Sequence, residues 1–473
     1  MEASAKERVI ALFEQWSGET AEAVSKLPAS GSYRRYYRIT GKTSSVLGAV
    51  NKDLKENRTF IEFSRFFHDK GLKVPEIYVV DAEMDCYLLE DLGNNTLFDW
   101  LSTARRGKDI PSAIVDFYKT CISQLIEFQI IGKNVDFSLC HPREKFDKQS
   151  MMWDLHYFKY YFLKLARISF DEQLLEDDFN RFTDYLLNTD CSYFMYRDFQ
   201  SRNIMVVDNK PAFIDYQGGR MGALQYDLAS LLYDAKADLP QSLRNELLNH
   251  YIMLISQKTE INESQFRETF NAYVLIRIMQ AMGAYGFRGF YEKKEHFLKS
   301  IPFAMNNINY ILTTQKIPDN FPTLYAALRE ITHNERLLQI SAGHDLTVTI
   351  NSFSYKRGIP IDFNGHGGGF VFDCRAIHNP GRYEEYKTKT GKDPEVIAFF
   401  EKEPEMHLFL DNCFSIVDQS LEKYIERDFK HLMINFGCTG GRHRSVYCAE
   451  QMARHLKEKF QVNIRIKHVE QEI

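Results

Sequence analysis

The chain lacks the features of a membrane-bound, secreted or nucleic-acid-coating protein. No stretch approaches the roughly 18 continuous apolar residues of a membrane span, and the start, MEASAKERVI, has no basic segment before an apolar run. The eight cysteines form no C-x-x-C pair, which argues against a zinc knuckle or a disulfide framework. The net charge of −5 excludes a globally basic protein. We therefore expect a cytoplasmic protein with reduced thiols and no membrane partner.

The composition predicts a folded protein of several domains. The 473 residues are 44% hydrophobic and 14% aromatic, which provides material for more than one packed core. Neither an internal repeat nor a low-complexity segment interrupts the chain. Weak signals around two prolines and Ser341–Gly343 indicate a linker. The domains that we predict span residues 1–93, 94–315 and 346–473, with the linker at 316–345.

Short apolar runs and helical periodicity alternate along the chain. Strand-like runs occupy residues 33–39, 45–50, 86–89, 193–196, 204–207 and 212–216, and helices dominate 110–187 and 227–312. After the linker, strand-like runs at 346–352, 369–373 and 431–436 alternate with helices at 395–400, 412–429 and 445–460. This alternation is typical of a small α/β domain.

The first chemical motif lies in the segment YRDFQSRNIMVVDNKPAFIDYQ, residues 196–217. A carboxylate at a strand end, Asp198, is followed by the amide of Asn203 and, one hairpin later, by Asp215. Asp198 can accept the proton of a substrate hydroxyl, while Asn203 and Asp215 offer hard oxygen ligands to Mg²⁺ on ATP. Two turn aspartates with Asn203 as a loop cap are the alternative, but the whole pattern favours phosphoryl transfer.

These residues resemble the aminoglycoside phosphotransferase and choline kinase superfamily. Tyr196 and Arg197 replace the usual His-Gly of its catalytic loop, as in the bacterial kinases that phosphorylate the anomeric hydroxyl of N-acetylmuramate or N-acetylglucosamine. GSYRRYYR (31–38) resembles their nucleotide-covering hairpin, LLEDLG (88–93) their hinge, and YDLASLL (226–232) a family helix. The resemblance covers about residues 5–310 and implies an α+β, protein-kinase-like bilobal fold of the aminoglycoside phosphotransferase type.

The resemblance also implies roles for further residues. Those expected to bind the nucleotide are Ser32, Tyr33, Arg34, Arg35, Lys52, Glu90 and Leu92. Those expected to bind substrate or orient the catalytic loop are Arg197, Gln217 and Asp227, and for Asp227 we favour the orienting role.

One departure concerns the lysine that kinases carry on the third strand. The run Val46–Asn51 contains no lysine, and Lys52 lies just beyond it. Either Lys52 or an arginine of the first hairpin must therefore meet the α- and β-phosphates. Glu62 on the next helix could pair with such a cation, although a solvated glutamate is the simpler interpretation.

The second motif is the loop GCTGGRHRSV, residues 437–446, between a strand-like run and a helix. Its main-chain N–H groups, the helix N-terminus and its cationic side chains are suited to a phosphate group. The predicted phosphate-binding residues are Cys438, Thr439, Gly440, Gly441, Arg442, His443, Arg444 and Ser445. The spacing of Cys438 and Arg444 also matches the C-x₅-R signature of thiolate phosphatases. We favour binding, because no general acid is evident.

The surrounding sequence resembles the C-terminal domain of the RNase adapter RapZ family over about residues 346–473. The resembling stretches are 353–360, 372–375, 378–380, 390–391 and 437–446. In that family the domain binds a phosphorylated aminosugar and a small regulatory RNA. The P-loop ATPase half of the family is absent, because no GxxxxGK[ST] occurs in the chain.

Together these patterns predict an ATP- and Mg²⁺-dependent kinase acting on a sugar or aminosugar hydroxyl, followed by a small α/β domain of RapZ C-terminal type that senses a sugar phosphate. The alternative is a regulatory RNA-binding adapter with a degenerate kinase-like half. Seven basic residues against two acidic ones in 441–468 could bind RNA or form a solvated face. We favour the enzyme, because Asp198, Asn203 and Asp215 are all present.

Overall fold

The computed structural model describes residues 2–28, 34–105, 109–315, 317–318, 320–334, 337–338, 346–362, 369–427, 429–460 and 462–471. The chain forms two compact units, Met1–Leu338 and Gln339–Ile473. The boundary lies inside the stretch 316–345 that we expected to be a linker. Helix α13 (Pro322–His333) of this stretch contacts α7 and α12 and is therefore part of the first unit.

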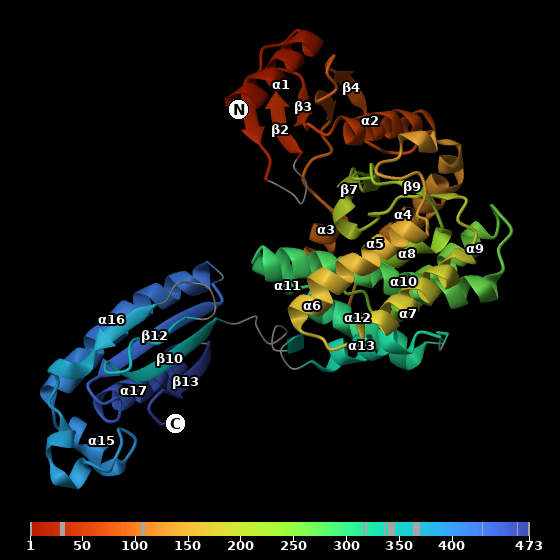
Figure 1. Ribbon diagram of the computed structural model, residues 1–473. Coiled ribbons are helices and arrows are strands. Elements are labelled where there is room, and N and C mark those ends of the chain that lie inside the picture. The colour runs from red at the N-terminus through yellow and green to blue at the C-terminus, as the bar shows by residue number, and fades with distance from the viewer. Residues whose placement is uncertain are drawn as a thin grey trace. The chain divides into compact units, whose positions relative to one another are not determined.

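The first unit begins with a lobe built on an antiparallel sheet (Figure 1). Its elements are α1 (Glu2–Ser17), β1 (Ala23–Lys26), β2 (Arg35–Thr40), β3 (Ser45–Val50), α2 (Leu54–Asp69), β4 (Ile77–Val80) and β5 (Cys86–Glu90). The strand order is β1-β2-β3-β5-β4. Val9 and Phe13 of α1 are buried against Ile39, Val46 and Leu88 of the sheet, which explains the apolar positions of these short strands.

Helix α2 has sequence-encoded ends that fix its position beside the sheet. The Asp53 side chain accepts a hydrogen bond from the Glu56 N–H at 3.0 Å and caps the N-terminus. At the other end, Gly71 has φ +82°, a left-handed conformation that glycine adopts at little cost. Gly71 therefore ends this helix.

The rest of the first unit is a mainly helical lobe. Its longer helices are α3 (Leu97–Ala104), α4 (Ser112–Ile131), α5 (Lys148–Phe158), α7 (Glu172–Leu187), α8 (Leu224–Leu232), α9 (Gln241–Ile255), α10 (Glu263–Tyr285) and α12 (Ile301–Thr314). The shorter helices are α6 (Lys164–Ala166) and α11 (Glu295–Leu298), and π-helical turns occupy Lys159–Leu163 and Gly286–Tyr291. Within the described residues, no helix has the length and apolar character that crossing a membrane requires.

Two antiparallel strand pairs carry the first motif of this lobe. They are β6 (Tyr193–Met195) paired with β9 (Arg220–Gly222), and the hairpin of β7 (Ile204–Val207) with β8 (Lys210–Phe213) that lies between them in the chain. Asp208 and Asn209 form the tight turn of this hairpin, both with positive φ, as their turn chemistry predicts. We expected a strand over 212–216, but β8 ends at Phe213. Asp215 has φ +72°, a conformation that does not continue a strand.

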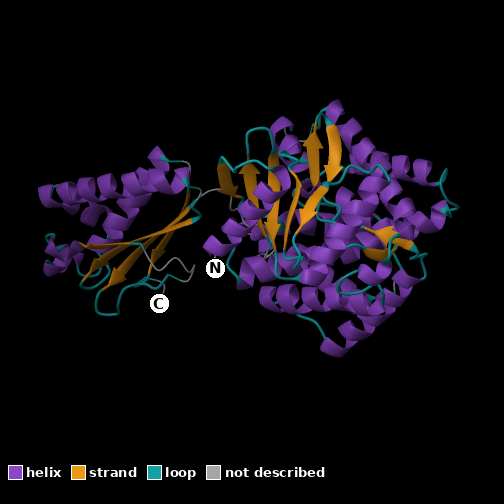
Figure 2. Ribbon diagram, turned by 90° about the horizontal axis from the view of Figure 1, so that it is seen from above, coloured by secondary structure: helices purple, strands orange, loops and turns teal. Residues whose placement is uncertain are grey.

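The second unit is an α/β domain with a parallel sheet. Its elements are β10 (Thr347–Ser354), β11 (Phe370–Asp373), α15 (Pro394–Phe400), α16 (Pro404–Glu426), β12 (His431–Cys438), α17 (Arg444–Lys459) and β13 (Asn463–His468). The order is β11-β12-β10-β13, and all pairs are parallel. Helices α16 and α17 share one apolar core with the sheet (Figure 2).

Strand β13 is an element that the sequence analysis did not predict. It is an edge strand paired with β10 alone, and its residues are mostly exposed. The stretch VNIRIK alternates apolar and polar residues, a strand signal that the sequence analysis overlooked.

Candidate functional site

The catalytic loop is anchored through its main chain by Asp227 of α8. The Asp227 carboxylate accepts hydrogen bonds from the N–H groups of Tyr196 at 2.7 Å and Arg197 at 2.9 Å. Burial raises the pKa of Asp227 to about 7, although the two N–H groups oppose this rise. Arg197 itself has φ +83°, a strained conformation for a residue with a side chain, and the two bonds hold it there. Asp227 therefore orients the loop that carries Asp198.

The Arg197 side chain points into the protein. Its Nη2 lies 2.7 Å from both carboxylate oxygens of Asp154 on α5. The guanidinium also lies over the rings of Phe146 and Tyr226, at 4.8 and 5.1 Å from the centroids. Of the two roles that the sequence left open for Arg197, this arrangement favours orienting the loop.

Asp198, Asn203 and Asp215 lie together around one amide. The Asn203 Nδ2 donates to the Asp198 carbonyl oxygen at 2.9 Å and to Asp215 Oδ2 at 3.1 Å. Because the nitrogen makes both bonds, the Asn203 Oδ1 is available to a cation. The β7–β8 hairpin brings Asn203 and Asp215 together, since one precedes β7 and the other follows β8. The three residues of the first motif thus form one cluster.

The electrostatics of Asp215 suit a cation. The side chain keeps access to solvent, yet the protein surrounds it closely. Partial desolvation, followed by the negative charge of Asp198, raises the pKa of Asp215. A divalent cation bound by Asp215 and the Asn203 oxygen would offset the repulsion between Asp215 and Asp198. Both ligands are hard oxygen atoms, which Mg²⁺ prefers. The residues present therefore fit a magnesium ion.

A polar chain runs from Asp215 into the sheet lobe. Gln217 Nε2 donates to Asp215 Oδ1 at 2.8 Å and to Glu56 Oε1 at 3.4 Å. The same Glu56 oxygen lies 3.1 Å from Nη2 of Arg34, whose side chain is only 3% exposed. Burial alone would lower the pKa of Arg34, but its neighbours, Glu56 among them, raise it above the usual value. A buried cation thus reaches the cluster from the position just before β2.

Glu56 is a site residue that the sequence analysis missed. It is the third residue of α2, and Asn51 Nδ2 donates to its second oxygen at 2.9 Å. Glu62, which we had considered as the partner of the missing lysine, instead pairs with Arg65 on the exposed face of α2. Two features of the sequence could have indicated Glu56. It lies in the first turn of a helix with an Asp cap, and an arginine-rich hairpin precedes that helix in the chain.

The other predicted nucleotide residues have different positions. Lys52 is exposed at the end of β3, and the described structure shows no contact between it and Asp215 or Glu56. Arg35 is half-buried and next to Arg34, and because side chains alternate along a strand it points to the opposite face of the sheet. Ser32 and Tyr33 lie outside the described residues. The structure therefore brings Arg34 to the cluster and leaves Lys52 apart from it.

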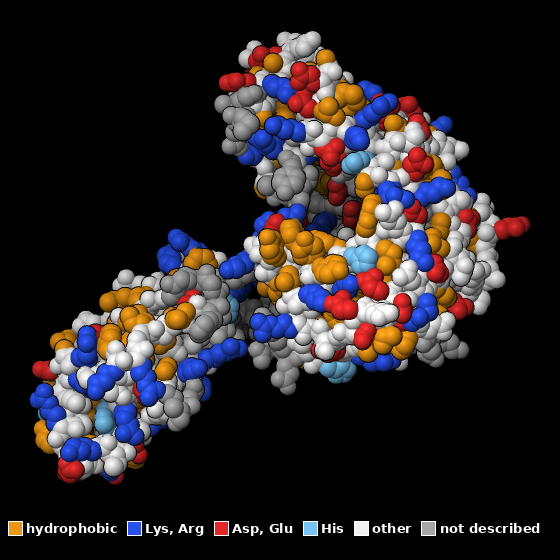
Figure 3. Space-filling view, viewed as in Figure 1, with side chains coloured by type: hydrophobic (Ala, Val, Ile, Leu, Met, Phe, Trp, Pro, Cys, Tyr) orange, Lys and Arg blue, Asp and Glu red, His pale blue; other side chains and the backbone are white. Residues whose placement is uncertain are grey.

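The hinge segment joins the two lobes beside this cluster. Leu92 is buried with Met205 and Ala212 of the β7–β8 hairpin. Glu90 pairs with Lys73 at 2.5 Å, and Arg38 Nε lies 2.5 Å from Asp91 Oδ2. The hinge therefore packs on the same hairpin that positions Asn203 and Asp215. Figure 3 shows the surface hollowed between the sheet lobe and the helical lobe.

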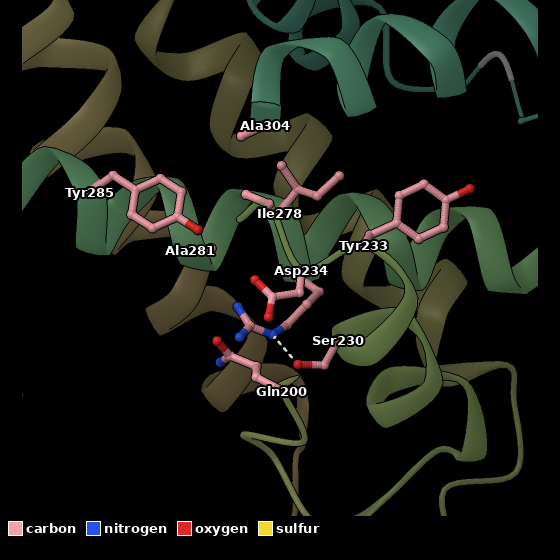
Figure 4. A pocket seen from close by; sticks show the side chains of 10 residues that line it. Gln200, Ser230, Tyr233, Asp234, Ile278, Ala281, Tyr285 and Ala304 are labelled. Atoms are coloured by element: carbon pink, nitrogen blue, oxygen red, sulfur yellow. Dashed lines mark hydrogen bonds between the residues drawn. The ribbon is translucent and has the colours of Figure 1, made fainter. Parts of the chain in front are cut away.

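A pocket lies within the helical lobe (Figure 4), and two of its lining residues contact Asp198. Gln200 and Arg277 on its wall both contact Asp198, at 3.2 and 3.7 Å. The other lining residues include the carboxylate of Asp234 and the aromatic rings of Tyr233 and Tyr285. The pocket is small: a water molecule can occupy about 20 Å³ of it, which is room for roughly one water. The pocket is polar, has aromatic faces and lies next to the candidate base.

The predicted anion loop of the second unit follows β12 at the carboxyl end of the parallel sheet. The sulfur of Cys438 accepts a hydrogen bond from the Gly441 N–H at 3.2 Å and lies 3.2 Å from Ser445 Oγ. Gly441 has φ +67°, and a Cβ there would lie 2.3 Å from Cγ of Glu470. Cys438 is only 3% exposed. The loop is thus wrapped tightly around a buried thiol.

The cationic residues of the loop differ in their surroundings. Arg444 is 5% exposed, and its Nη1 donates to the carbonyl oxygens of Arg375 and Ile377 at 2.8 and 2.9 Å. Its Nε is buried and has no hydrogen-bond partner in the described structure. Arg442 is exposed, as are Thr439 and Gly440, whereas His443 Nε2 lies 2.9 Å from the Tyr386 carbonyl oxygen. Arg444 therefore ties the loop to the segment after β11 and keeps one donor unused.

Sequence comparison matches two families to these two units. Residues 24–261, about half of the chain, match the phosphotransferase enzyme family. Residues 346–472 match the RapZ C-terminal domain. A nucleotide-binding protein of Xylella fastidiosa (strain M12) is 38% identical over 129 residues, which are 27% of this chain and 40% of that protein. The chain thus spans about two fifths of the length of this relative.

Two further kinds of similarity were found. A nucleotide-binding protein of Psychrobacter sp. is 27% identical over 259 residues, covering 52% of this chain and 75% of that protein. Among solved structures, Plasmodium vivax ethanolamine kinase superposes with a TM-score of 0.45 at 15% identity, covering 62% of this chain and 83% of the kinase. An amicoumacin kinase in complex with AMP-PNP and Ca²⁺ has a TM-score of 0.45 at 12% identity, with 70% and 95% covered.

The sequence matches and the geometry agree on the expected fold class. A protein-kinase-like bilobal unit of the aminoglycoside phosphotransferase type precedes a parallel-sheet α/β domain of RapZ C-terminal type. The chain belongs to the phosphotransferase enzyme family, and it carries a RapZ C-terminal domain after its phosphotransferase domain.

Proposed function

We propose that the chain is an ATP- and Mg²⁺-dependent kinase that phosphorylates a hydroxyl of a sugar or aminosugar. The observation that carries this proposal is the cluster of Asp198, Asn203 and Asp215. Asp198 would accept the hydroxyl proton of an acceptor bound beside it. Asn203 and Asp215 hold Mg²⁺, which neutralises charge on the nucleotide phosphates.

The nucleotide is assigned to the cleft between the lobes. Arg34 supplies the cation that kinases usually take from a strand lysine, and Glu56 fixes its position. The adenine would contact the hinge main chain near Glu90 and lie on the apolar cluster around Leu92. Ser32 and Tyr33, which precede Arg34 in the chain, remain part of this nucleotide-site proposal.

We propose an acceptor of the sugar class, of the N-acetylhexosamine or N-acetylmuramate type. This choice rests on Tyr196 and Arg197, the variant of the catalytic loop that resembles the bacterial aminosugar kinases. The small pocket lined by Gln200 and Arg277 has no room for such a ligand, so the acceptor is expected elsewhere beside Asp198.

The test is ATP consumption against a panel of free hexosamines, their N-acetyl forms and N-acetylmuramate. Asp198→Asn should lower turnover on the order of 10²–10⁴-fold, the usual contribution of a general base. Circular dichroism should show an unchanged fold. Near wild-type turnover in this variant would remove Asp198 from the mechanism.

We further propose that the loop 437–446 binds a sugar phosphate without cleaving it. Main-chain donors, the N-terminus of the 16-residue helix α17 and the unused Arg444 Nε all suit a phosphate group. Cys438, the nucleophile of a thiolate phosphatase, is almost completely buried here. Calorimetry with hexosamine phosphates tests this binding.

A regulatory RNA-binding adapter is the second candidate. The observation that favours it is a set of exposed basic residues, Arg454 and Lys457 on α17 and Arg465 and Lys467 on β13. Contacts to an RNA backbone would make affinity fall steeply with salt. Filter binding of RNA at two salt concentrations tests it, and an affinity that is weak at low salt would exclude this role.

A further inference from the structure

Asp198 makes two side-chain contacts, and both involve the same carboxylate oxygen. Gln200 Nε2 donates to Asp198 Oδ1 at 3.2 Å. Nη2 of Arg277 lies 3.7 Å from this same Oδ1. Within the described part of the chain, no hydrogen bond reaches Oδ2. One oxygen of the candidate base is therefore held, and the other is left open.

Arg277 is itself held firmly by partners on two helices. Its Nε donates to Ser230 Oγ of α8 at 2.9 Å, the bond drawn as a dashed line in Figure 4. Its Nη1 donates to Gln280 Oε1 of α10 at 2.6 Å. The side chain is only 9% exposed. Because the guanidinium is planar, these two bonds also fix the direction of its third nitrogen, Nη2.

We propose that Arg277 is the positioning residue of the catalytic base. Its charge and the Gln200 amide hold Oδ1 of Asp198, so that Oδ2 points to the acceptor hydroxyl. This assignment rests on the kinase function proposed above. In the reaction the hydroxyl proton passes to Oδ2 while the hydroxyl oxygen bonds to the γ-phosphorus. The bond from that phosphorus to the β–γ bridging oxygen breaks, and its electron pair leaves with ADP.

The experiment is a double-mutant cycle between Arg277 and Asp198. Arg277→Gln should lower kcat roughly tenfold to 100-fold, the equivalent of a charge-assisted contact, and leave the KM for ATP nearly unchanged. In an Asp198→Asn background the same change should have little further effect, because Arg277 then has no base to position. Arg277→Lys keeps the positive charge but loses the planar guanidinium, so its kcat should lie between those of Arg277→Gln and the wild type.

The matched control is Arg267→Gln on the same helix. Arg267 pairs with Glu263 and Asn249 and has no contact with the pocket residues in the described structure, so this variant should behave as wild type. Wild-type protein that consumes no ATP with any acceptor would contradict the kinase function itself. If the wild type is active and Arg277→Gln has the same kcat as Arg267→Gln, only the positioning role is overturned. The positioning role is also overturned if Arg277→Gln lowers kcat by the same factor with Asp198 and with Asn at position 198, because Arg277 would then support the fold and not the base. If Arg277→Gln does not fold, the same double-mutant cycle is measured with Arg277→Lys.

Discussion

At the scale of single residues, Arg34 is a cation that is linked to the proposed metal site through Glu56 and Gln217. A guanidinium differs from the lysine of other kinases because its planar fork can engage a carboxylate and a phosphate at the same time. Arg34 is already paired with Glu56, and Glu56 is bonded through Gln217 to Asp215. The nucleotide cation and the metal ligand are therefore parts of one connected network.

Two substitutions distinguish Arg34 from Lys52. Arg34→Ala should weaken binding of an ATP analogue with Mg²⁺ by about 1.5–3 kcal/mol, the value of a charged hydrogen bond. Lys52→Ala should leave the affinity within about twofold, because the side chain is exposed and apart from the cluster. Isothermal calorimetry measures both. The reverse order of effects would assign the phosphate contact to Lys52.

At the scale of structural elements, α8 controls the catalytic loop through one buried carboxyl. In the folded protein Asp227 has a pKa of about 7, against 3.8 as the ordinary value. Between these values the folded state binds one more proton than the unfolded chain. Raising the pH through this window therefore releases that proton and removes stability.

Comparison with Asp227→Asn isolates this effect, because asparagine does not titrate. The free energy of unfolding of wild type minus that of the variant should fall by about 1.4 kcal/mol per pH unit between pH 5 and 6. It should level off above pH 8. Urea unfolding at four pH values measures it, and a difference that stays constant from pH 5 to 7 would show that Asp227 is ionised throughout.

The anion loop is the second element with a distinct expectation. Arg444→Ala should weaken hexosamine phosphate binding by about 2–3 kcal/mol, because it removes a charged donor and loosens the segment after β11. Cys438→Ala should leave the affinity within a few-fold. Arg454→Ala, at an exposed position of the same helix, is the matched control. Phosphate release that stops in Cys438→Ala would instead establish a phosphatase.

At the scale of the whole molecule, the chain combines two units with separate cores. Each unit is expected to unfold cooperatively, so calorimetry should resolve two transitions. An ATP analogue with Mg²⁺ should raise the temperature of one transition, and a hexosamine phosphate that of the other. At 100 times Kd each ligand adds about 2.7 kcal/mol to the unit that binds it. A single transition raised by both ligands would contradict this independence.

Much of the local structure could be predicted from short sequence patterns. The hairpin around Asp208 and Asn209 follows from turn chemistry, and the loop between β12 and α17 from glycines placed between an apolar run and a helix. Strand β13 was missed although VNIRIK alternates apolar and polar residues, because this short pattern follows directly after the helix that ends at Lys459. Glu56 was missed because a glutamate in a first helical turn normally serves the helix dipole.

The sequence by itself determined the two families and the residues Asp198, Asn203 and Asp215, since motif spacing along one hairpin is a local property. Only the tertiary structure decided that Arg34 and not Lys52 reaches the cluster, and that Arg277, 79 positions beyond Asp198, contacts it. Contacts of this kind depend on how β2, α2, α8 and α10 pack against one another. That packing is set by the buried apolar surfaces of whole elements, and no short motif records it.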